Sequence, residues 1–340
     1  MLLVIFGAGA SYDAIPVSKR QQFGKESRMP LANDLFAESP KQNSLLRDYN
    51  VVRIADVMRR RSVKNQNFDL EEELEKLQTT ATSNMRLMRE LFATRYYVKR
   101  LIYIYGANVD NDLHGVTNYV TLLHHLQALK RKCRISISLA TFNYDMLLDN
   151  ALGAVSDWKD EDRNWGNYST GDGRDFDYYK LHGSIDWGFE LSTEWKWERD
   201  PKTVIQQFNW VDVDSYEIKK YPPSMENSNV PALSLPFKGK ATLTMPQFMQ
   251  KRLESKLPEI TSLLCVGWRG NDDHFIKLMG ERAKDMTKVA VVTPNLESGE
   301  LLIEKLKSVT NINSTKNLTT EFCDFVAGDE LKDTLDFLTF

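Results

Sequence analysis

The sequence is poor in cysteine, and this scarcity excludes two kinds of architecture. Its 340 residues include three cysteines, which stand far apart at Cys133, Cys265 and Cys323. No two of them form a CxxC pair, so a structural zinc site built from four cysteines is excluded. Separated cysteines do not make a disulfide framework either, and we expect a reducing, cytoplasmic location.

The sequence also lacks a long apolar run and an excess of charge of one sign. No stretch approaches the roughly 18 apolar residues that a membrane-spanning helix needs, and the apolar start is too short for a signal peptide. Lys plus Arg number 44 and Asp plus Glu number 47, so the formal net charge is −3. This balance gives no general attraction to nucleic acid, so we expect neither membrane association nor direct nucleic-acid binding.

What the chain does contain is an alternation of short apolar runs and helical patterns. Residues 2–6 form a continuous apolar run that ends at Gly7, which is typical of a strand buried on both faces. The later runs that predict strands are 134–142, 178–181, 261–266 and 288–292. Strands that alternate with helices predict an α/β fold with a Rossmann-like, mostly parallel sheet.

The segment between the first and second predicted strands has a helical pattern almost throughout. We therefore expect residues 16–132 to form an inserted, mainly helical subdomain, and residues 1–15 and 133–340 to form the sheet domain. Within the insertion, one helical stretch is predicted to begin after a capping Asp69 and to end at Gly106.

Two later segments do not show a clear period. Residues 153–176 are rich in Gly, Asp, Asn and Trp and predict a surface loop. Residues 184–240 are aromatic and contain proline, and we expect them to fold as short strands and turns.

The first candidate site is Gly7-Ala8-Gly9-Ala10-Ser11, directly after the first strand. Glycines permit close backbone approach, and the N–H groups that follow could cradle phosphate oxygens together with the Ser11 hydroxyl. It is not a Walker A loop, since no Gly-Lys-Ser/Thr follows, and Tyr12 replaces the third glycine of a dehydrogenase fingerprint. The alternative is that these glycines serve only the packing of a strand-to-helix turn.

Polar side chains also follow the second and third predicted strands. Asn143 and Asp145 come after one strand, and His182 comes after the next. Open α/β sheets bind their ligands at this edge, and an imidazole is the natural general base near neutral pH. The alternatives are that the Asn-x-Asp pair caps a helix and that His182 is a satisfied structural histidine.

Two loops nearer the C-terminus carry further candidates. The loop that begins at Gly267 could hold ribose hydroxyls through Asp272 or Asp273, and the alternative is that Asp273 caps the next helix. Asn295 follows another strand and could touch the adenosine half of a nucleotide, or could belong to a simple turn. The histidines at 114, 124 and 125 lack a carboxylate or cysteine at metal spacing, so no metal is expected.

Read in order, these segments resemble the sirtuin-like superfamily. The N-terminal segment, with Ile15-Pro16 after it, is similar to the family's GAGxS…GIP motif. Residues 141–145 are similar to its TQNxD motif, and Leu181-His182-Gly183 is similar to its catalytic LHG motif. Residues 30–36 look more like the bacterial sirtuin-like branch than like the deacylases.

The resemblance implies that NAD lies at the carboxyl edge of a Rossmann-type sheet. It implies that Asn143 orients the nicotinamide ribose or a water, that Asp145 faces the nicotinamide carboxamide and that His182 acts as general base. The NAD-contacting positions that it implies are Gly7, Ala8, Gly9, Ser11, Asp145, Gly267, Asp272 and Asn295.

The chain departs from the deacylases in ways that change the expected reaction. The deacylases follow their histidine with four zinc-binding cysteines, which are missing here, and Phe142 replaces the family's glutamine. The resemblance then implies hydrolysis of NAD to nicotinamide and ADP-ribose, as in NAD-consuming effectors of anti-phage defence. Such effectors often work with a partner protein, which here could be an ATPase. An unrestrained NAD hydrolase would kill its host, so we expect activity to depend on assembly into a homo-oligomer through the helical block at 31–132. A non-catalytic NAD or ADP-ribose sensor, a deacylase and an ADP-ribosyltransferase stay open as alternatives.

Overall fold

The fold is described from a computed structural model, and the description covers most of the chain. The described residues are 1–24, 27–65, 68–81, 83–156, 176–190, 200–207, 217–224, 229–235 and 243–340. The surface loop predicted at 153–176 therefore falls largely outside the described residues. Within them, none of the helices combines the length and apolar character that a bilayer-spanning segment requires.

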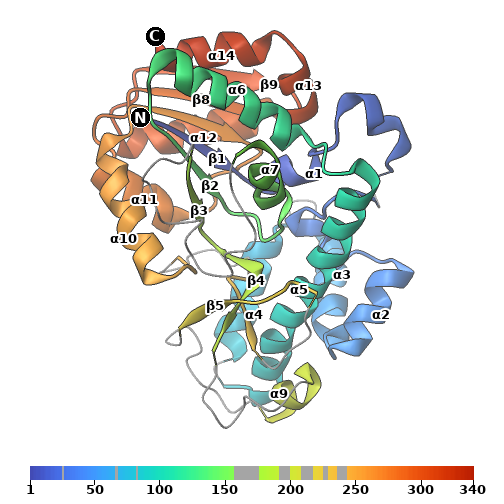
Figure 1. The fold of residues 1–340 in the computed structure, drawn as a ribbon. Coiled ribbons are helices and arrows are strands. Elements are labelled where there is room, and N and C mark those ends of the chain that lie inside the picture. The colour runs from blue at the N-terminus through green and yellow to red at the C-terminus, as the bar shows by residue number, and fades with distance from the viewer. Residues whose placement is uncertain are drawn as a thin grey trace.

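A six-stranded parallel sheet organises the described part of the chain (Figure 1). Its strands are β1 (Leu2–Phe6), β2 (Ile137–Thr141), β3 (Asp177–Lys180), β7 (Ser262–Val266), β8 (Lys288–Thr293) and β9 (Ser314–Thr319). They lie in the order β3-β2-β1-β7-β8-β9, which is 3-2-1-4-5-6 in chain order. That order is typical of doubly wound, dinucleotide-binding sheets. The predicted Rossmann-like, mostly parallel α/β fold is confirmed.

The central strands are buried on both faces, as their continuous apolar runs predicted. Every residue of β1, β2 and β7 is buried. The helices that follow strands are α1 (Ala8–Tyr12), α7 (Leu147–Val155), α11 (Asp273–Arg282), α12 (Leu296–Val309), α13 (Phe322–Ala327) and α14 (Glu330–Thr339). Among them α12 packs on β8 and β9, and α14 packs on β7 and β8. Covering both faces in this way is what a parallel sheet requires.

The insertion between β1 and β2 is helical, as predicted. Its helices are α2 (Pro40–Asp48), α3 (Val52–Lys64), α4 (Leu70–Ala81), α5 (Met85–Leu113) and α6 (Asn118–Cys133), with short 3₁₀ turns η1 (Val17–Gln22) and η3 (Ala32–Asp34) before them. In Figure 1, α2 to α5 lie together in the lower half of the view, whereas α6 lies beside the parallel sheet. Consistent with this, α6 packs against α7 and α13. The division into residues 16–132 and the remainder stays a prediction.

Two details of the insertion test the sequence patterns. Asp69 caps α4 as predicted, because its Oδ1 accepts the N–H groups of Glu71 at 2.9 Å and Glu72 at 3.2 Å. The predicted helix end at Gly106 is wrong: α5 continues to Leu113 and stops where His114 turns left-handed, with φ 50°. A glycine costs a helix only about 1 kcal/mol, and the packing of a long helix outweighs that cost.

Residues 184–240 were expected to give short strands and turns, and their described parts do so. An antiparallel sheet of order β5-β4-β6 is formed by β4 (Gly183–Phe189), β5 (Ile218–Lys220) and β6 (Val230–Leu233). The short helix α9 (Pro201–Gln207) also lies here, and α5 packs against β4, β6 and α9. The chain then returns to the main sheet through α10 (Gln247–Lys256) and η6 (Leu257–Glu259).

Candidate active site

A cavity of about 400 Å³ opens at the carboxyl ends of the parallel strands. Each strand of the main sheet contributes residues that follow it. The contributing residues lie within 7–13 after β1, 142–145 after β2, at 182 after β3, and within 267–272, 294–298 and 320–322 after β7, β8 and β9. The strand order reverses between β1 and β7, and sheets of this kind bind ligands at that reversal.

All the candidate residues taken from the sequence line this one cavity. They are Gly7, Ala8, Gly9, Ser11, Asn143, Asp145, His182, Gly267, Asp272 and Asn295. The fold thus brings together segments that are separated by more than half of the chain. Their common location follows from the parallel sheet, because its strands all end at the same edge.

The glycines after β1 are explained first by the packing of two loops. The Gly9 N–H donates to the Gly267 carbonyl oxygen at 3.1 Å, and a Cβ on Gly7 would lie 2.4 Å from that same oxygen. Gly267 has a φ of 61°, and its own Cβ would lie 2.3 Å from the Ala10 nitrogen. The packing alternative therefore accounts for these glycines, and the close approach sets exposed Ala8 at the cavity wall.

Asn143 is buried and bridges two segments. Its Nδ2 donates to the Gly7 carbonyl oxygen at 2.8 Å and to Ser11 Oγ at 2.9 Å, and it lies 3.3 Å from the Tyr119 hydroxyl. Ser11 and Tyr119 are themselves 2.9 Å apart. The two N–H groups of this amide are thus used inside the protein, so a ligand would meet its carbonyl oxygen. Tyr119 comes from α6, and no sequence motif indicated it.

Asp145 combines a capping contact with an unfavourable environment for charge. The N-cap residue of α7 is Met146, and Asp145 Oδ1 accepts the N–H of Leu147, the first residue of that helix, at 3.0 Å, so the capping alternative holds in part. Burial raises the pKa of Asp145, although the positive charge of Lys180 opposes the shift. The Lys180 ammonium is fully buried, 2.6 Å from the Asp145 carbonyl oxygen and 2.9 Å from Asp149 Oδ2.

His182 forms a close pair with Asp272 across the cavity edge. Its Nε2 lies 2.5 Å from Asp272 Oδ2, and both side chains are largely buried. The His182 and Phe142 rings meet edge to face, with ring centroids 4.8 Å apart. Phe142 in turn stacks on Trp268 at 5.1 Å. The imidazole of His182 therefore packs against Phe142, which is stacked on Trp268, and also has a carboxylate partner.

The two later candidates are helix caps that also line the cavity. Asp272 Oδ1 accepts the Phe275 N–H at 2.7 Å and caps α11, and Asn295 Oδ1 accepts the Ser298 N–H at 2.7 Å and caps α12. The expectation that Asp273 would be the cap of α11 is wrong: the cap is Asp272, and Asp273 pairs with Lys305 at 3.1 Å. Because Oδ1 of Asp272 caps the helix, its Oδ2 can contact His182. The sequence did not predict this contact.

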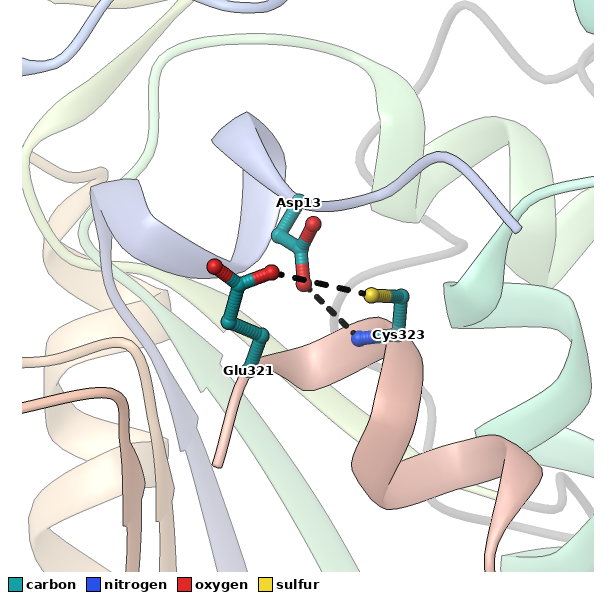
Figure 2. Close-up of side chains that lie close together, drawn as sticks. All are labelled: Asp13, Glu321 and Cys323. Carbon is teal, nitrogen blue, oxygen red and sulfur yellow. Dashed lines mark hydrogen bonds between the residues drawn. The ribbon is translucent and has the colours of Figure 1, made fainter. Parts of the chain in front are cut away.

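A second cluster on the cavity wall was missed altogether. Figure 2 shows Asp13 at the end of α1 facing Glu321 and Cys323 at the start of α13, with Asp13 Oδ2 accepting the Cys323 N–H at 2.8 Å. These are metal-ligand residue types, but Arg20 bonds both Cys323 Sγ, at 3.3 Å, and Glu321. Burial and the nearby Asp13 raise the pKa of the Cys323 thiol to about 12. A metal would need the thiolate, so this set does not favour one.

Comparison with known proteins gives weak similarity only. No family model matches the chain, and no curated protein matches it in sequence. A solved structure of a Sir2 homologue–NAD complex has 12% identity and a TM-score of 0.39, covering 100% of this chain and 90% of that one. A complex of mutant Sir2 homologues with 2′-O-acetyl ADP ribose has 11% identity and a TM-score of 0.43, covering 100% and 93%. Similarity of this extent assigns neither family nor function. The protein's own fold and site define a Rossmann-type α/β protein with a cavity, lined by both polar and apolar residues, at the reversal of its strand order.

Proposed function

We propose that this protein is an enzyme that hydrolyses the nicotinamide–ribose bond of NAD, releasing nicotinamide and ADP-ribose. The observation that carries the proposal is the convergence of Asn143, Asp145 and His182 with the Gly7–Ser11 segment on one cavity. A sheet of this strand order binds dinucleotides at that edge. The resemblance of the same segments to sirtuin-like motifs supports NAD as the dinucleotide.

The residues fit such a ligand. The cavity volume of about 400 Å³ lies in the range of small-molecule sites, and polar groups from each strand end are spread along it. In this proposal Gly7, Ala8, Gly9 and Ser11 lie against the phosphates, and Gly267, Asp272 and Asn295 border the rest of the dinucleotide. Asp145 faces the carboxamide of the nicotinamide.

The chemistry that these side chains can supply matches the bond to be broken. The glycosidic C–N bond breaks with its electron pair going to nicotinamide, which leaves as a neutral base, and the ribose carbon gains positive charge. A water oxygen then bonds to that carbon and gives up a proton. His182 accepts the proton, and the Asn143 carbonyl oxygen orients the water or a ribose hydroxyl. Each such group contributes about 10²–10⁴-fold to a rate.

Water is the proposed acceptor because nothing in the sequence supports the deacylase alternative. The zinc-binding cysteines that accompany deacylation are missing from the segment after His182. We further propose, from the resemblance of residues 30–36 to the bacterial branch, an effector of anti-phage defence. Several of these residues line the cavity. Assembly into a homo-oligomer through the helical insertion, and a partner protein such as an ATPase, belong to the same proposal.

One observation favours a second function, a sensor that binds NAD or ADP-ribose without turnover. Both N–H groups of Asn143 and the Nε2 atom of His182 already have partners within the protein. A site whose polar groups are engaged in this way can hold a ligand without reacting with it. Retention of uncleaved NAD after hours with the protein would support the sensor and contradict the hydrolase.

The experiment that tests the hydrolase uses purified protein, NAD at neutral pH and chromatographic separation of the products. We expect nicotinamide and ADP-ribose from the natural protein, and a loss of about 10²–10⁴-fold in kcat for His182→Ala. His125 is exposed on α6, so His125→Ala is a matched control that should keep full activity. Equal turnover by the natural protein and His182→Ala would overturn the assignment of the base.

A further inference from the structure

The contact between His182 and Asp272 joins two segments 90 residues apart. His182 stands between β3 and β4, and Asp272 closes the loop between β7 and α11. The side chain of Asp272 is 3% exposed and that of His182 is 11% exposed. Nε2 and Oδ2 lie 2.5 Å apart, within hydrogen-bonding distance.

The carboxylate of Asp272 is held in one orientation. Its Oδ1 accepts the Phe275 N–H at the first turn of α11, so Oδ2 has a fixed direction toward the imidazole. The N-terminus of a helix favours a negatively charged side chain at this position. An ionised carboxylate only accepts hydrogen bonds. The proton between the two side chains therefore belongs to Nε2.

The imidazole and its main chain have further contacts. The ring packs edge to face with Phe142. The main chain of His182 is fixed by the Ser234 N–H, which donates to its carbonyl oxygen at 2.9 Å. The next residue, Gly183, has a φ of 84° and lies so close to Ala232 that its Cβ would be 1.8 Å from that carbonyl oxygen. The ring thus has little freedom to turn.

From this geometry we infer that Asp272 is a positioning residue, which fixes the tautomer of His182 with its proton on Nε2 and makes Nδ1 the basic atom. The inference rests on the proposed function for its kinetic consequence, but the tautomer itself does not depend on turnover. It moves Asp272 from contacting ribose, the role expected from the sequence, to orienting the base. A carboxylate that orients an imidazole also stabilises the imidazolium formed when the base takes a proton.

The variant Asp272→Asn separates this role from helix capping. Asparagine is as good an N-cap as aspartate, so its side-chain oxygen can still accept the Phe275 N–H. Its NH₂ group then faces Nε2 and donates to it, so the ring proton moves to Nδ1. Asp272→Ser is the second variant, because serine caps the helix without reaching the ring. Asp273→Asn is the matched control, since Asp273 is exposed and pairs with Lys305.

The first readout is the ¹⁵N spectrum of the five histidines at a pH where the rings are neutral, with His182 assigned by its loss in His182→Gln. We expect His182 to carry its proton on Nε2 in the natural protein and on Nδ1 in Asp272→Asn. The Asp273→Asn spectrum should match the natural one. A proton on Nδ1 in the natural protein, or an unchanged tautomer in Asp272→Asn, would overturn the inference.

The second readout is the split between kcat and KM for NAD. Loss of the basic atom should lower kcat of Asp272→Asn by at least about 10²-fold while KM changes little, and Asp272→Ser, which leaves the tautomer unfixed, should lose less. A kcat of Asp272→Asn within threefold of the natural value would show that the contact between His182 and Asp272 contributes only to the structure and not to catalysis. If the natural protein does not cleave NAD, the proposed function fails, while the tautomer still decides the role of Asp272.

Discussion

Two groups of polar side chains lie at the same cavity, and their surroundings differ. The His182 group consists of Asn143, Asp145, His182 and Asp272, which all line the cavity. The Asp13 group consists of Asp13 and Glu321, which line the cavity, and of Cys323, Arg20 and Arg28 beside them. The carboxylates of both groups accept backbone N–H groups. In the first group an imidazole is the other partner, whereas in the second the other partners are guanidinium groups, which keep their charge at any working pH. Similar residue types can thus exchange protons in the His182 group, whereas in the Asp13 group the carboxylates stay charged in ion pairs.

The largest expected difference concerns the reactivity of Cys323. The shift of its pKa from 9.0 to about 12 lowers its thiolate fraction near pH 8 by about 10³-fold. We expect iodoacetamide to modify the partly exposed Cys133 first, and to leave buried Cys323 and Cys265 unmodified until the protein unfolds. Mass spectrometry of the alkylated peptides measures this. Modification of Cys323 as fast as Cys133 would make the Asp13 group a reactive centre and remove the contrast between the groups.

The contrast between the groups also explains what the sequence could and could not predict. The His182 group was predictable because its members follow apolar runs, and parallel strands bring their carboxyl ends to one edge. The Asp13 group was not, because Asp13 and Cys323 are 310 residues apart and neither stands in a pattern. The partner of His182 was missed for the same reason, since a capping aspartate gives no sign of where its second oxygen points. The prediction that the helix ends at Gly106 was wrong because it considered only the low helix propensity of glycine. It did not consider the packing of the helix, which outweighs that propensity.

The second prediction concerns stability and removes Asp13. Arg28 is largely buried 3.6 Å from Asp13 Oδ1 and lies over the Tyr12 ring, so Asp13→Ala leaves a buried cation without its carboxylate. It also leaves the Cys323 N–H without its acceptor. We expect the free energy of unfolding, measured by urea denaturation, to fall by about 3 kcal/mol. Asp13→Asn keeps an acceptor for that N–H and should lose less. A loss below about 1 kcal/mol for Asp13→Ala would show that the Asp13 group does not hold α1 and α13 together.

The smallest expected effect concerns Asp145. Here we expect the substitution to increase the free energy of unfolding, whereas Asp13→Ala lowers it. Because burial raises its pKa above the ordinary 3.8, the folded state holds this proton more tightly than the unfolded state. The carboxyl therefore contributes fully to stability when the pH is below its ordinary pKa. This contribution is lost as the pH rises through the raised pKa of the folded state. Asp145→Asn removes the charge, and its side-chain oxygen can still accept the Leu147 N–H. We expect this variant to be more stable than the natural protein by on the order of 1 kcal/mol at pH 7, and by less at pH 4.

Urea unfolding of both proteins at the two pH values measures the difference. A destabilised Asp145→Asn at pH 7 would mean that attraction to Lys180 outweighs burial, and the two groups would then be alike in being held by fixed charges. The expected stabilisation, accompanied by weaker NAD binding, would instead show that the His182 group retains a carboxylate at a cost to the fold. A residue that destabilises its own fold and lines a cavity is better explained by a ligand than by packing.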